Sequence, residues 1–160
     1  MANCNFGSCG ILKTERMRPH EICLPRRAVF NETEVKNIEK AESVLEGRGF
    51  DLFSPMRHEV RTEPGTVDWA WDIFEMDRTE IDRADLVVAL YYGNVSDSGT
   101  AWECGYAYAK GVPVVLVHVN EVADSNLMMH VGCATNLSWG DLETFDFERL
   151  PRIEYEGEMF

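Results

Sequence analysis

The chain of 160 residues lacks the features that mark several large classes of protein. No apolar run approaches the length of a membrane-spanning helix, because the longest, Val112–Val119, includes Pro113 and His118 and has the length of a strand. No basic-then-apolar signal pattern opens the chain, so we expect a cytoplasmic protein without membrane association. The 5 cysteines are an odd number for a disulfide framework, and free thiols are expected.

A metal site and a nucleic-acid partner are also not expected. Cys4 and Cys9 could begin a zinc site, but no compact Cys/His cluster follows them. The histidines are scattered singly along the chain, as His20, His58, His118 and His130. A net charge of −13 repels polyanions, which argues against binding to DNA or RNA but not against binding a small neutral ligand.

Residues 1–19 are expected to form an irregular extension, and residues 20–160 a single domain in which strands and helices alternate. The apolar runs predict strands at Glu21–Leu24, Phe50–Ser54, Ala84–Tyr92, Val112–Val119 and Ala134–Leu137. Periodic patterns predict helices at Glu32–Glu46, Val67–Ile81, Ser98–Lys110 and Asn126–Val131, and another from about Gly140. This order predicts an α/β fold: a doubly wound, flavodoxin-like, mostly parallel five-stranded sheet with helices on both faces.

Such sheets bind ligands beyond the carboxyl ends of the strands, at the point where the strand order reverses. The site is therefore expected in the loops Pro25–Phe30 and Tyr91–Thr100, after the first and third strands. Tyr91 can line this pocket. The aromatic residues Trp69, Trp71 and Phe74 on the second predicted helix are expected in the core or at a subunit interface.

The stretch Asp97-Ser98-Gly99-Thr100-Ala101-Trp102-Glu103 leaves the central strand and opens a helix rich in Gly and Ala. We expect Glu103 in the first turn of this helix, where backbone N–H groups favour an ionised carboxylate that can attack a sugar carbon. Alternatively, Thr100 and Glu103 form a capping box and serve only the helix. Asp97 and Asp77 favour the catalytic reading, because several carboxylates at one crevice suit glycosidic chemistry.

The sequence resembles the nucleoside 2′-deoxyribosyltransferases over about Glu21 to Phe160. The resemblance rests on an ordered set of short stretches: Ala28–Asn31, Phe53–Pro55, Ala84–Ala89, Asp97–Glu103, Gly105–Ala107, Asn126–Met128 and Tyr155–Phe160. It implies a cofactor-free enzyme that moves 2-deoxyribose between purine and pyrimidine bases through a covalent intermediate on Glu103. It also implies that Asp97 and Asp77 bind the substrate or protonate the base.

The same resemblance implies further contacts with the nucleoside. Phe30, Ser98 and Gly99 would lie in the pocket, and Phe160 would bring the terminal carboxylate to it. Asn126 and Met128 match residues that a neighbouring subunit contributes to the site. This implies a homo-oligomer in which dimers are grouped into a tetramer or a hexamer.

The chain departs from the family pattern in the first loop. Cys23 replaces a tyrosine that often holds the nucleophile, and Glu59 stands where a glutamine often contacts the base. Arg26 and Arg27 are either solvated or bind a 5′-phosphate, and the second case would indicate a nucleoside-monophosphate N-glycosidase. A non-catalytic domain that senses nucleosides or nucleotides is the alternative outside enzymes.

Overall fold

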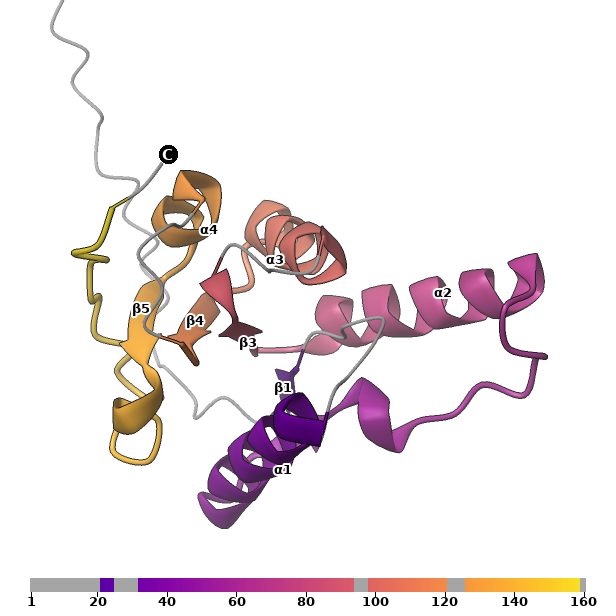
Figure 1. Ribbon diagram of the computed structural model, residues 1–160, viewed down its shortest axis with the longest axis horizontal. Helices are drawn as coiled ribbons and strands as arrows, with labels where there is room; N and C mark the ends of the chain where they lie inside the picture. The colour runs from indigo at the N-terminus through magenta and orange to yellow at the C-terminus, as the bar shows by residue number, and fades with distance from the viewer. Residues whose placement is uncertain (1–20, 25–31, 94–97, 121–125, 159–160) are drawn as a thin grey trace, which may run out of the picture.

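The structure is a computed structural model that describes residues 21–24, 32–93, 98–120 and 126–158 (Figure 1). Its strands are β1 (Glu21–Cys23), β2 (Asp51–Phe53), β3 (Leu86–Tyr91), β4 (Val114–His118) and β5 (Thr135–Ser138). Its α-helices are α1 (Glu32–Gly47), α2 (Val67–Arg83), α3 (Ser98–Lys110) and α4 (Leu127–Gly132). Two short 3₁₀ helices lie at Pro55–Arg57 and Trp139–Asp141. No helix among these residues is long and apolar enough to cross a membrane.

The strands form one sheet in the order β2-β1-β3-β4-β5, and every pair of neighbours is parallel. This confirms the predicted doubly wound α/β architecture. The strand order reverses between β1 and β3, where Ile22 pairs with Leu86 and Cys23 with Val87. The predicted position of the ligand crevice is therefore the carboxyl edge of these two strands.

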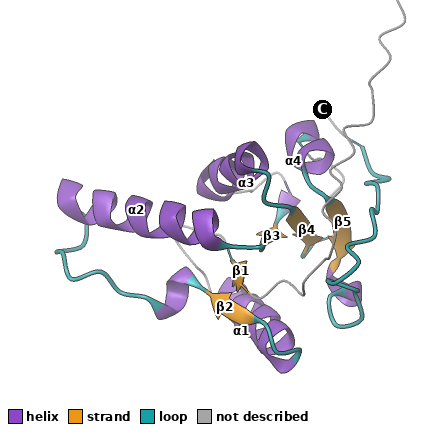
Figure 2. Cartoon of the chain, turned by 180° about the vertical axis from the view of Figure 1, so that it is seen from behind, coloured by secondary structure: helices purple, strands orange, loops and turns teal. Residues whose placement is uncertain are grey.

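Helices cover both faces of the sheet, as Figures 1 and 2 show. Helices α2, α3 and α4 lie over one face, and α1 and the segment after β5 lie over the other. Side chains of β3 alternate between the two cores: Val87 and Ala89 face the first, and Leu86 and Val88 the second. Because both faces are buried, β3 is apolar along its whole length, which made it easy to find in the sequence.

The helix expected from about Gly140 is wrong. The chain forms the 3₁₀ helix Trp139–Asp141 and then a series of turns. In one of these turns the carboxylate of Asp146 accepts hydrogen bonds from the backbone N–H groups of Glu148 and Arg149, at 3.1 and 3.0 Å. Local bonds of this kind satisfy the backbone without a helix.

Helix α3 packs on the sheet through small inward residues such as Cys104 and Ala107. Ala107 is fully buried among side chains of β3, β4 and α2, whereas Ala109 on the same helix is exposed. Close packing leaves no room for a larger side chain at Ala107. The glutamate carried by the same helix is thereby held at a fixed height above the sheet.

We expect Ala107→Leu to lower the free energy of unfolding by about 1–3 kcal/mol, because overpacking a closed core forces strained side chains or backbone shifts. Urea denaturation followed by circular dichroism measures the change. Ala109→Leu, on the exposed face of the same helix, is the matched control and should change the free energy by less than about 0.5 kcal/mol. Equal losses in both variants would contradict the close packing of α3 on the sheet.

Candidate active site

The carboxyl ends of β1 and β3 lie side by side, and a glycine turn leaves β3 there. Gly93 has φ = 73°, a left-handed conformation that residues with a Cβ adopt at a cost. The two connecting loops include residues 25–31 and 94–97, which lie outside the described residues. The predictions for Arg26, Arg27, Phe30, Asp97 and the terminal Phe160 therefore stay predictions.

Two of the predicted carboxylates lie buried on the same face of the sheet. Asp77 projects from α2 and is 8% exposed, and Glu103 projects from α3 and is 6% exposed. Cys23 at the end of β1 is buried in the core of that same face. Carboxylates are seldom buried to this degree unless they are bound by other groups or serve a function.

The pKa of the Cys23 thiol responds to the charges of both carboxylates. Burial raises the pKa of the Cys23 thiol well above its ordinary value, and the negative charge of Glu103 and then of Asp77 raises it further. The charges of both carboxylates therefore act on this thiol. Cys23, which replaces the tyrosine of the family pattern, is thus within the electrostatic influence of the predicted nucleophile.

The other described cysteines line the same core. Burial and the charge of Glu103 raise the pKa of Cys104 to about 12, and burial raises that of Cys133 to about 11. All three described cysteines are free and buried. In the described residues, no group of three His, Cys, Asp or Glu side chains could hold a metal ion.

The position of Glu103 within its helix differs from the expected one. Helix α3 begins at Ser98, so Thr100 lies inside its first turn and Glu103 in its second. Glu103 is therefore not in the first turn as expected, and Thr100 does not stand before the helix as a capping box requires. The burial of Glu103 places it against the sheet, which a carboxylate that only caps a helix end does not need.

The remaining predicted contacts are dispersed around this centre. Ser98 and Gly99 are exposed at the start of α3, and Glu59 is exposed in the segment between β2 and α2. Tyr91 is buried at the end of β3, where its hydroxyl oxygen accepts a bond of 3.4 Å from the Asn126 backbone N–H. Tyr91 thus connects the central strand to the start of α4.

Asn126 and Met128 lie on the outside of the chain. The side-chain oxygen of Asn126 caps α4 by accepting a bond of 2.9 Å from the Met128 N–H, and the Met128 side chain is 74% exposed. A groove of about 480 Å³ separates α3 from α4. Exposed apolar side chains border it: Tyr108, Leu127, Met128 and Val131.

A second exposed apolar surface runs over α2 and α3. Trp71 is 60% exposed, so the expectation of a core position is wrong for this residue. Phe74, 37% exposed, contacts Trp71 with ring centroids 5.8 Å apart and Trp102 at 5.0 Å. The alternative expectation, a subunit interface, stays a prediction.

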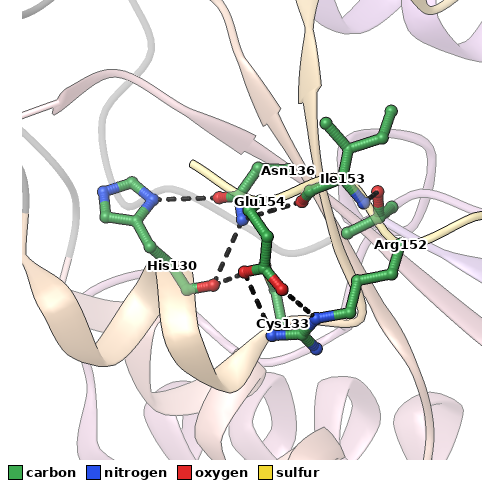
Figure 3. Close-up of polar contacts among 7 residues, drawn as sticks. His130, Cys133, Asn136, Arg152, Ile153 and Glu154 are labelled. Carbon is green, nitrogen blue, oxygen red and sulfur yellow. Dashed lines mark hydrogen bonds and ion pairs between the residues drawn. The ribbon is translucent and has the colours of Figure 1, made fainter. Parts of the chain in front are cut away.

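Sequence reasoning missed a cluster at the edge of the sheet, which we call the Asn136 cluster: His118, His130, Asn136 and Tyr155. His118 and His130 are scattered singly along the sequence, but their rings stack with centroids 5.1 Å apart, and both contact the Asn136 side chain. Figure 3 shows how Asn136 lies between His130 and the C-terminal segment. The residues come from four segments, and no spacing rule connects them.

The chain is similar to known nucleoside 2-deoxyribosyltransferases in sequence and in fold. The family model for nucleoside 2-deoxyribosyltransferases matches residues 24–137. The 2-deoxyribosyltransferase of Bacillus psychrosaccharolyticus is 34% identical, with a TM-score of 0.76 over 84% of this chain and 98% of that one. No curated protein matches the chain.

A more distant structure shares the fold alone. The CMP N-glycosidase of Clostridium botulinum is 22% identical, with a TM-score of 0.55 over 81% of this chain and 93% of that one.

The structure defines an α/β protein with a doubly wound parallel sheet and two carboxylates buried on one of its faces. The chain belongs to the nucleoside 2-deoxyribosyltransferase family.

Proposed function

We propose that the protein transfers 2-deoxyribose between purine and pyrimidine bases, with Glu103 as the nucleophile. The observation that carries this proposal is the burial of Glu103, Asp77 and Cys23 on one face of the sheet, in a chain of this family. A buried carboxylate held by a helix against the sheet has a fixed direction of attack. Such positioning accounts for much of the catalytic effect of an enzyme.

The reaction proceeds in two displacements. A Glu103 carboxylate oxygen attacks the anomeric carbon of the sugar, and the electron pair of the N-glycosidic bond passes to the leaving base, which takes a proton from Asp97 or Asp77. The deoxyribosyl group is then an ester on Glu103. A nitrogen of a second base attacks the same carbon, loses its proton to the carboxylate that acted as acid, and releases Glu103.

Transfer is proposed over hydrolysis because the chain belongs to the nucleoside 2-deoxyribosyltransferase family. Glu103, Asp77 and Cys23 are all buried, so little water surrounds the proposed nucleophile. Exclusion of water also strengthens the electrostatic stabilisation of the oxocarbenium-like transition state. Hydrolysis is the expected minor reaction when no acceptor base is present.

We expect Glu103→Gln to lower the rate of deoxycytidine formation from deoxyadenosine and cytosine by at least about a thousandfold, because the amide oxygen is a poor nucleophile. Chromatography of the products measures the rate, and mass spectrometry of the unsubstituted enzyme with deoxyadenosine alone should reveal one added deoxyribosyl group. Glu75→Gln, which removes an exposed carboxylate of α2, is the control and should retain the activity.

Full activity of Glu103→Gln would overturn the assignment of the nucleophile. If the unsubstituted protein binds deoxyadenosine but neither transfers nor hydrolyses it, the non-catalytic sensing domain is the correct reading.

The donor is proposed to be a nucleoside, and Arg26 and Arg27 are the reason to test its 5′-monophosphate. Guanidinium groups bind phosphate strongly, so arginines at the mouth of the site would favour the phosphorylated donor. We expect kcat/KM for deoxycytidine to exceed that for its 5′-monophosphate, and the double variant Arg26→Ala/Arg27→Ala to leave this ratio unchanged. A preference for the monophosphate that the double variant abolishes would instead establish the N-glycosidase alternative.

We further propose that the site is completed by a second copy of the chain. The exposed apolar residues around the groove between α3 and α4 support this, because contiguous apolar surface of this kind marks protein interfaces. Asn126 and Met128 lie on that surface, where they can reach the pocket of a neighbour. The arrangement makes activity depend on assembly.

Met128→Asp should dissociate the oligomer and lower the transfer activity together, because a carboxylate is costly to bury in an apolar interface. Sedimentation velocity measures the assembly, and the transfer assay at the same concentration measures the activity. Ser43→Asp, which places the same charge at an exposed position of α1, is the control and should change neither. A monomeric and fully active Met128→Asp protein would rule out the shared site.

A further inference from the structure

The Asn136 side chain has an orientation that its partners determine. Its Nδ2 group donates to the backbone carbonyls of His130 and Ile153, at 3.2 and 3.4 Å (Figure 3). Carbonyl oxygens only accept, so the amide cannot be reversed. Its Oδ1 therefore faces His118 Nε2 at 3.1 Å and His130 Nδ1 at 3.0 Å, and each imidazole donates its proton to that oxygen.

This one side chain joins the outer elements of the sheet to the C-terminal segment. His118 ends β4, His130 lies in α4, and Asn136 itself lies in β5. Beyond the sheet, the Asn136 N–H donates to the Ile153 carbonyl at 3.0 Å, and the Ile153 N–H donates to the Thr135 hydroxyl at 3.0 Å. The residues after 150 are thereby attached to the edge of β5 although they form no strand.

Aromatic stacking continues the attachment along the C-terminal segment. The Tyr155 ring lies parallel to His130, with centroids 3.9 Å apart, and to His118 at 5.0 Å. Tyr91, at the end of β3, meets both imidazoles edge-on at 5.6 and 5.5 Å. The Asn136 cluster thus reaches from the central strand to the residues that lead to the chain end.

We propose that Asn136, His118 and Tyr155 are positioning residues for the transfer reaction, which hold α4 and the C-terminal segment in place at the site while both imidazoles are neutral. This rests on the proposed function, in which Asn126, at the start of α4, and Met128, within it, complete the pocket of a neighbouring copy. The C-terminal segment lies against α4 through the stacking of Tyr155 on His130. None of the three residues is proposed to contact the substrate. They act through the segments that they join.

The cluster is built for neutral rings. Burial lowers the pKa of His118 and of His130, and the closeness of His130 lowers that of His118 further, while the bonds to Asn136 act in the opposite direction. Two protonated rings stacked 5.1 Å apart would repel each other. Because the unfolded chain binds protons near the ordinary pKa of 6.5 and the folded rings bind them only at lower pH, the stabilisation is complete above pH 6.5. It is lost as the pH falls from there through the lowered pKa of the folded rings.

Other titratable groups face the cluster from each neighbouring element. Tyr91 approaches from β3, the Cys133 thiol from the end of α4, where it donates to the His130 carbonyl, and Tyr155 from the C-terminal segment. Carboxylates line the cavity beside His118, and they belong to Asp141, Glu154 and Glu156. Asp141 accepts a bond from the Ser138 hydroxyl and Glu154 pairs with Arg152, so two of these charges are already engaged locally.

Hydrogen exchange of the full chain, followed by mass spectrometry, tests the proposal without reference to activity. After correction for intrinsic rates, peptides covering residues 151–157 should exchange at least about tenfold faster at about pH 5.5 than at about pH 7.5, whereas β3 and β4 should stay protected at both. In Asn136→Leu the C-terminal peptides should exchange fast at both pH values. His118→Phe retains a stacking ring but removes one proton and one bond, so the pH dependence should shrink.

His58→Phe is the matched control, because His58 also stacks on an aromatic ring, that of Phe53, but lies outside the cluster. It should leave the exchange of residues 151–157 and its pH dependence unchanged. If Asn136→Leu does not fold, which the exchange of β3 and β4 would reveal, His118→Phe carries the test. Protection of the C-terminal peptides that is independent of pH in the unsubstituted chain, or equal in His118→Phe, would overturn the proposal.

Transfer kinetics separate this proposal from the function on which it rests. His118→Phe and Tyr155→Leu should raise KM by about tenfold at about pH 7.5 with a smaller change in kcat, and His118→Phe should move the acid limb of the pH profile to lower pH. Released C-terminal peptides together with unchanged kinetics would overturn the positioning role. Absence of turnover in the unsubstituted chain would refute the transferase, while the exchange results would still decide whether the cluster holds the C-terminal segment.

Discussion

The short pairing between β1 and β3 is the constraint on which the rest of the structure depends. Two residue pairs, Ile22 with Leu86 and Cys23 with Val87, join the two halves of the sheet. Because the strands are parallel, each connection must cross a face of the sheet, and α2 and α3 therefore lie over the same face on either side of the junction. Asp77 and Glu103 come together around Cys23 for this reason, although they are carried by different helices.

The fold could be predicted where one physical signal dominated. Strand β3 and helix α2 were found because one is buried on both faces and the other is amphipathic, and their ends differ from expectation by about two residues, as is usual for element boundaries. The helix expected from Gly140 failed because turns with their own side-chain bonds replace it. Such bonds depend on local geometry that hydrophobic periodicity does not encode.

The candidate site was predicted to different degrees in its different parts. Glu103 and Asp77 were expected near the switch point, and the structure buries both on one face of the sheet, while their catalytic roles stay predictions. Glu103 was expected in the first turn of α3 but lies in the second, since the helix starts before Thr100. The Asn136 cluster could not be found, because it forms only after β4, β5 and the C-terminal segment lie side by side. The spacing of the histidines along the chain does not indicate this cluster.

The helix that carries Glu103 and the elements at the edge of the sheet differ in how firmly they are attached. Glu103 belongs to a helix packed on the central strands, whose position is determined by close-packed apolar side chains such as Ala107. The elements proposed to complete the pocket lie at the edge of the sheet, where a few polar bonds and stacked rings attach them. In the proposed reaction the nucleophile must keep its direction of attack, whereas the wall around the bases must open for one base to leave and another to enter. A rigid centre with a polar attachment at its edge meets both requirements within one small domain.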